Sequence, residues 1–157
     1  MHHYLVAILI LLAAAAPSAW GEGNAADVTD MQALRAAVRA DKKAFVAQTM
    51  QLTEAEAKNF WPIYDRYQRD VDMANRLHVR AIEGFIARDR PITSAYLKAL
   101  GNDLITADEI EIKARRKMFS SLIKALPADK AARYLQLESK IRAYEDYDVA
   151  TTFPLIK

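Results

Sequence analysis

Four arginines are the side chains in this sequence that are best placed to bind a charged ligand. They are Arg66, Arg69, Arg76 and Arg80. At about 100° per residue on a helix they form one stripe, on a different side from an apolar line through Tyr67, Val71 and Phe85. Such a stripe can meet acidic groups, but a solvated face that keeps a protein soluble has the same pattern. It therefore indicates a binding surface only where other features of the chain support one.

Enzymatic chemistry is not expected from this composition. The chain has no Cys, only 4 Gly and no phosphate-binding loop. A Ser-His-Asp triad would have to recruit His78 from the middle of a predicted helix. The adjacent carboxylates Asp108 and Glu109 lie among basic residues at ordinary surface spacing. We therefore predict a protein that is not an enzyme and that uses no cofactor.

A metal site is not expected either, although a metal sensor remains an alternative. A transition-metal site needs several His, Glu, Asp or Met donors that converge on one ion. His78 is the only His after residue 21, and Met73 lies on another part of the same helical wheel. A lone His on an apolar face is more often a core or interface residue than a ligand.

The arginines belong to a long predicted helix, around which the rest of the chain is organised. Thr53, followed three residues later by Glu56, forms the pattern of a capping box at its start. From Phe60 to Phe85 apolar residues recur every three or four positions, which is a helical period. A helix over residues 54–88 would be roughly 50 Å long. Pro62 removes one intrahelical hydrogen bond, so we predict a bend over residues 58–62.

Three further helices are expected. Asp30 can cap a first helix that ends near residues 48–51, Thr93 can cap a helix over residues 94–126, and a last helix runs from Pro127 to about Tyr147. A seven-residue spacing predicts coiled antiparallel packing of the third helix against the second; it joins Ile105, Ile112, Phe119 and Leu126. We therefore expect an all-α fold, an elongated antiparallel hairpin of about four helices, in a single domain over residues 22–157.

Residues 1–21 have the pattern of a cleaved signal peptide. The run from Tyr4 to Ala16 is apolar but too short for a comfortable transmembrane helix, and small residues flank a predicted cleavage after Gly21. We expect export to the periplasm without stable membrane insertion; because the segment lacks Lys and Arg, a retained anchor is the alternative. The 22 basic and 20 acidic residues that follow are interleaved, which argues against a nucleic-acid partner.

An internal repeat links the starts of the second and fourth predicted helices. Leu52, Phe60, Ile63 and Tyr67 match Leu126, Tyr134, Leu137 and Ile141 at a constant offset of 74. The copies open as Leu52-Thr53-Glu54-Ala55-Glu56 and Leu126-Pro127-Ala128-Asp129-Lys130. Over roughly residues 45–147 the chain thus resembles the Spy/CpxP family of periplasmic helical chaperones and envelope-stress regulators, which is marked by paired Leu-Thr-x-x-Gln motifs. Glu56 and Lys130 replace the Gln of that family, and Pro127 replaces its second Thr.

The resemblance implies an antiparallel four-helix subunit that dimerises into a thin curved cradle. Its concave face would hold unfolded or partly folded envelope proteins without ATP, through apolar and cationic side chains. The four arginines are the cationic candidates for client contacts, and Phe60, Trp61 and Tyr64 are the aromatic candidates. We therefore expect a homodimeric chaperone-like or stress-responsive factor. An inhibitory partner of a sensor kinase would use the same kind of surface and remains an alternative.

Overall fold

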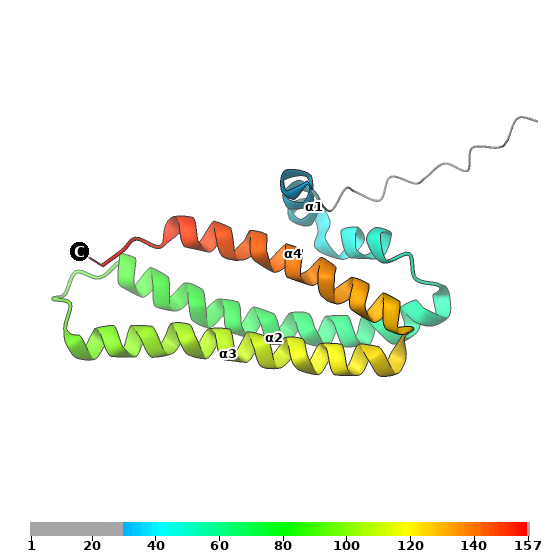
Figure 1. The fold of residues 1–157 in the computed structure, drawn as a ribbon. Helices are drawn as coiled ribbons and strands as arrows, with labels where there is room; N and C mark the ends of the chain where they lie inside the picture. The colour runs from blue at the N-terminus through cyan, green and yellow to red at the C-terminus, as the bar shows by residue number, and fades with distance from the viewer. Residues whose placement is uncertain (1–29, 157) are drawn as a thin grey trace, which may run out of the picture.

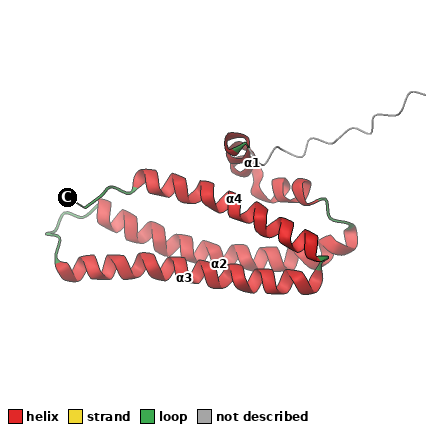
Figure 2. Cartoon of the chain, viewed as in Figure 1, coloured by secondary structure: helices red, strands yellow, loops and turns green. Residues whose placement is uncertain are grey.

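The computed structural model describes residues 30–156, and these form four helices and no strand (Figure 2). The helices are α1 (Met31–Met50), α2 (Glu54–Ile86), α3 (Ser94–Ala125) and α4 (Ala128–Thr152). The predicted all-α fold is therefore confirmed. The predicted signal peptide lies outside the described residues.

The helices form an elongated bundle (Figure 1). Helices α2 and α3 lie side by side as an antiparallel hairpin, α4 folds back along them, and α1 packs on α4. With 33 residues, α2 is about 50 Å long. The segment after α4 ends near the connection between α2 and α3. One face of the α2–α3 hairpin is thus covered by the other helices.

The N-caps predicted at Asp30, Thr53 and Thr93 are all present. Each side chain accepts a hydrogen bond from a backbone N–H of the first helical turn. At the start of α2 the capping box is complete: the N–H of Glu56 donates to Oγ1 of Thr53 at 3.3 Å, and the N–H of Thr53 donates to Oε2 of Glu56 at 2.8 Å. Pro127 is the N-cap of α4 and provides no such hydrogen bond. These caps fix where the long helices begin.

A break in helical geometry lies in α1, where the sequence did not predict one. Asp41 has φ −163° and ψ 98°, and Figure 1 shows the two halves of α1 pointing in different directions. Its carboxylate accepts a hydrogen bond from the N–H of Ala44 at 2.9 Å, so it caps the second half. Helix α2 continues through Pro62 as one helix; the bend over residues 58–62 stays a prediction. Pro62 is exposed, and on that side a carbonyl without its intrahelical donor can bond to water.

The face of α3 that enters the core differs from the predicted one. Its buried residues are Leu100, Ala107, Ala114, Met118 and Leu122. Of the predicted heptad line, Phe119 and Leu126 do pack on the core, but Ile105 and Ile112 are 59% and 50% exposed. That part of the packing prediction was wrong. Small Ala residues at a seven-residue spacing occupy the buried face instead, and their size permits a close approach of α2 and α3.

The core is concentrated at one end of the bundle. Along the inner line of α2, Phe60, Tyr67 and Val71 are buried, whereas His78 and Phe85 are only partly buried. The buried residues of α4 end at Arg142. Beyond α4, the ring of Phe153 packs edge-on against Phe85 with centroids 5.5 Å apart. The second half of α4 therefore spans a more open region between the core and this distal contact.

Candidate binding surface

The four predicted arginines lie together on the exposed side of α2. Arg66, Arg69, Arg76 and Arg80 are all exposed, and Met73, which is 50% exposed, lies among them on the helical wheel. We call these five residues the basic face. Because α2 is a continuous helix of 33 residues, the face is a straight array of long side chains on a rigid support.

The arginines of the basic face differ from the basic residues of α1 in whether they form ion pairs. All four basic residues of α1 form ion pairs with α2 or α4; these are Arg35–Asp148, Arg39–Asp148, Lys42–Glu145 and Lys43–Asp65, at 2.7 to 3.4 Å. Within residues 30–156, no arginine of the basic face forms an ion pair or a side-chain hydrogen bond. The charges of α1 are therefore paired within the fold, and those of the basic face remain available to a ligand.

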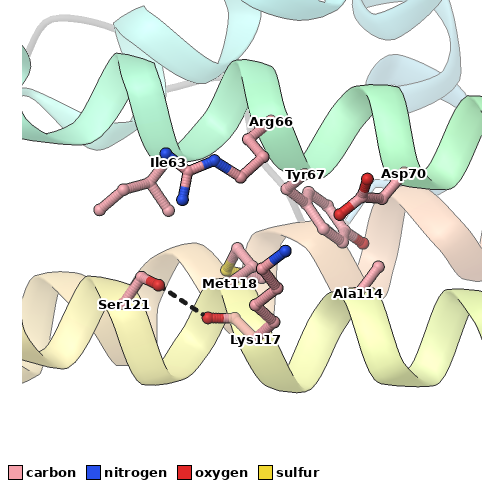
Figure 3. Close-up of a pocket in the computed structure, with 8 residues that line it drawn as sticks. All are labelled: Ile63, Arg66, Tyr67, Asp70, Ala114, Lys117, Met118 and Ser121. Atoms are coloured by element: carbon pink, nitrogen blue, oxygen red, sulfur yellow. Dashed lines mark hydrogen bonds between the residues drawn. The ribbon is translucent and has the colours of Figure 1, made fainter.

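Beside Arg66, the seam between α2 and α3 offers no room for a ligand. Figure 3 shows Arg66 and Asp70 of α2 and Lys117 of α3 lining this seam, together with the buried Tyr67 and Met118. The hollow that they line has a volume of only about 10 Å³. That is room for at most a single water molecule. Further along the seam, a second hollow of about 150 Å³ is lined by Arg80, Tyr96 and Asp103 among others. A ligand of the basic face would therefore lie on its surface or reach into this second hollow.

The three predicted aromatic contacts are not part of this surface. Phe60 and Tyr64 are buried, and Phe60 packs edge-on against Tyr134 of α4 with ring centroids 5.0 Å apart. Trp61 is partly buried, and Nζ of Lys43 lies 5.0 Å from the centroid of its ring. Phe60 and Tyr64 are thus core residues that a client could not reach in this conformation. Their aromatic spacing reflects packing between α2 and α4.

A buried charge cluster centred on Arg142 was not predicted from the sequence. Arg142 is buried on α4, and its guanidinium donates to both carboxylate oxygens of Glu111 on α3. It also donates to Glu145 at 2.8 Å, to Asp146 at 3.2 Å and to the side-chain carbonyl of Asn75 on α2 at 3.3 Å. The available signal was an arginine beside Ile141 on the apolar line of the last helix. The cluster ties three helices together.

A second buried polar group is Glu138, which is fully buried one turn before Arg142. The hydroxyl of Tyr134 donates to its Oε2 at 3.1 Å, and Nζ of Lys42 lies 3.7 Å from its Oε1. Burial raises the pKa of Tyr134 well above its ordinary value, and the charge of Glu138 raises it further. Tyr134 therefore stays a protonated donor near neutral pH, which fits a structural role.

The described residues contain neither a cluster suited to a metal ion nor a helix suited to span a membrane. Within residues 30–156, no three His, Cys, Asp or Glu side chains converge in a way that could hold a metal ion. His78 is partly buried on the inner line of α2, and Met73 lies on the basic face. Among the described helices, none combines the length and the apolar character that a membrane span needs.

Comparison with family models, with curated proteins and with solved structures gives no match for this chain. The resemblance to the Spy/CpxP family therefore stays a prediction from the sequence motifs.

Proposed function

We propose that the protein is an exported, non-enzymatic binding protein that holds unfolded or partly folded proteins on the basic face of α2 without ATP. The observation that supports this function most directly is the set of four exposed arginines that have no partner among the described residues. Export to the periplasm and assembly as a homodimer belong to the proposal; the first depends on the pattern of residues 1–21, and both agree with the resemblance to the Spy/CpxP family.

The chemistry of the basic face suits clients of variable shape. Guanidinium groups form bidentate hydrogen bonds with carboxylates, and their planes stack on aromatic side chains. Met73 adds a flexible apolar contact between two of the arginines. A surface of this kind needs no fixed shape in its partner, because each side chain adjusts independently. Because the charges are exposed, we expect binding to weaken as salt is added.

Suppression of aggregation by the protein tests the proposal. The client is an acidic model protein that aggregates when its disulfides are reduced, and light scattering follows the reaction. We expect suppression without nucleotide, unchanged by a metal chelator and reduced by salt. Replacing Arg66, Arg69, Arg76 and Arg80 by Gln should abolish most of the suppression while the circular dichroism spectrum stays helical.

A matched control carries the same change in charge at other places. Arg90, Lys98, Arg116 and Arg133 are exposed and form no ion pair among the described residues, so their replacement by Gln removes four charges outside the basic face. This variant should retain suppression. Equal loss in both variants would show that net charge matters and the basic face does not. Metal-dependent activity would instead favour the sensor alternative.

A further inference from the structure

A groove between α3 and α4 is a second candidate site, on another side of α2 from the basic face. It has a volume of about 510 Å³ and lies beside the open part of the bundle. Ile112 of α3, Val149 of α4 and Phe153 provide its apolar lining. From α2, His78 also lines the groove. Ile112 is one of the two residues that the heptad pattern placed in the core and that the structure leaves at least half exposed.

The groove is bounded at both ends by specific contacts. Towards the core, Arg142 joins α4 to Glu111 of α3 and Asn75 of α2. At the distal end, Phe153 packs on Phe85. These contacts fix α4 and the segment after it relative to α2 and α3 at the two ends of the groove. A preformed groove lowers the ordering cost that a ligand must overcome.

The polar lining of the groove is acidic. Three carboxylates line it, those of Asp108, Glu111 and Asp146, against the single guanidinium of Arg115. Glu111 is paired with Arg115 at 2.7 Å and with Arg142, whereas Asp108 forms no ion pair within the described residues. Burial raises the pKa of Asp146; Arg142 opposes the rise, and the carboxylates of Glu111 and Glu145 add to it. The arginines therefore leave an excess of negative charge beside an apolar wall.

We propose that this groove binds a short extended segment of a client protein that carries an apolar side chain next to Lys or Arg. The apolar side chain would lie against Ile112, Val149 and Phe153, and the cation would meet Asp108 and Asp146. Charge complementarity selects this occupant, because an acidic segment would meet two or more carboxylates of its own sign. The groove thus prefers the opposite charge to the basic face. A client with both an acidic and a basic segment would bind at both surfaces. Binding of one segment would keep the other at a high effective concentration beside its own site.

Two capped peptides test the site against the isotope-labelled protein by NMR titration. One has the sequence Gly-Leu-Lys-Phe-Lys-Gly, and the other has Glu in place of both Lys. We expect the Lys peptide to shift the methyl resonances of Ile112 and Val149, and the Glu peptide to leave them unchanged. Asp108→Asn and Ile112→Ser should each weaken the Lys peptide by roughly fivefold, the size of one exposed charge pair or one partly buried side chain.

Matched controls exist on the same helix. Glu109→Gln removes an exposed carboxylate that pairs with Lys113, and Ile105→Ser removes an exposed isoleucine one heptad earlier; neither residue lines the groove. Both variants should bind the Lys peptide as the parent does. The variant with four Gln on the basic face should also keep this binding, so failure of one site is separable from failure of the other.

Several results would overturn the assignment. Equal binding of the two peptides would remove the role of charge, and peptide binding that leaves the methyl groups of Ile112 and Val149 unmoved would place the site elsewhere. Shifts of these methyl groups with protein concentration alone would show that a second copy of the chain fills the groove. As a control for folding, the melting temperatures of Asp108→Asn and Ile112→Ser should match that of the parent, so that a loss of binding is not a loss of folded protein.

Discussion

Nζ of Lys130 lies 2.6 Å from Oε2 of Glu56, and these two residues stand at the same position in the two copies of the internal repeat, 74 residues apart. Phe60 and Tyr134 are equivalent in the same way, and their rings are in contact. Equivalent residues meet in this manner when they lie close to an approximate two-fold axis. The starts of α2 and α4 therefore pack on each other as the two halves of one repeat.

The ion pair predicts a coupling between the two copies. Glu56 also completes the capping box of α2, so Glu56→Gln keeps an acceptor for the N–H of Thr53 but loses the charge. We expect Glu56→Gln and Lys130→Gln each to lower the melting temperature. The double variant should lower it by less than the sum of the two single decreases. Thermal melts in a double-mutant cycle measure the coupling. The exposed pair Glu109–Lys113 is the control, and its coupling should be close to zero. Additive losses at Glu56 and Lys130 would contradict the prediction.

The same pair predicts a dependence of stability on pH. The hydrogen bond from Lys130 lowers the pKa of Glu56 below its ordinary value of 4.5, and the N–H of Thr53 lowers it further. Since the folded state favours the ionised carboxylate, this stabilisation is full above the ordinary pKa and is lost as pH falls through the folded pKa. Urea unfolding should show Glu56→Gln less stable than the parent near pH 7, with the difference shrinking as pH falls below the ordinary pKa of 4.5 and through the lower pKa of the folded state. A constant difference across this range would exclude the linkage.

Features governed by local chemistry could be predicted from the sequence. The caps at Thr53 and Thr93 need only a hydroxyl at the N-cap and a first helical turn whose backbone N–H can donate to it. About three or four residues therefore specify each cap. The pairs Glu109–Lys113 and Glu111–Arg115 follow from the four-residue spacing of a helix, and both are present. The exposed stripe of arginines on α2 could also be predicted, because it depends only on the period of one helix.

Features set by packing between helices could not be predicted in the same way. The register of α3 depends on how closely its backbone approaches α2, and alanines at Ala107 and Ala114 decide it. The break at Asp41 lies in an alanine-rich helix, where propensity alone favours continuity. Arg142 is buried because carboxylates from α3 and α4 converge on it, which no single helix reveals. Of these features, the contacts of Arg142 bound one end of the groove between α3 and α4.

Gln51, between α1 and α2, predicts a stabilising substitution. It is the C-cap of α1 with φ 48° and ψ 51°, a left-handed conformation that costs energy in a residue with a Cβ atom. Gln51→Gly should raise the free energy of unfolding by about 0.5–1 kcal/mol. Its backbone carbonyl, which accepts from Lys130 at 3.4 Å, is kept. Gln51→Ala is the control, since it truncates the same exposed side chain and keeps the Cβ atom. Equal stability of the Gly and Ala variants in urea unfolding would refute the assignment of strain.

Arg142 predicts the largest loss of stability. Its guanidinium is buried, and although burial lowers its pKa, Glu111, Glu145 and Asp146 raise it on balance, so it stays charged. Arg142→Met should cost about 3–5 kcal/mol in urea unfolding, because it leaves carboxylates without their cation in a partly buried site. Arg142→Lys should cost less, since the charge remains but the forked contact with Glu111 is lost.

A second substitution separates loss of the ion pair from loss of packing. If the unpaired carboxylate causes the damage, Glu111→Leu combined with Arg142→Met should be more stable than Arg142→Met alone. Arg133→Met, on the exposed side of the same helix, should change stability by less than about 0.5 kcal/mol. Because Arg142 anchors one end of the groove between α3 and α4, Arg142→Met should also alter the methyl resonances of Val149. A stable Arg142→Met variant with unchanged resonances would show that the cluster does not hold α4 in place.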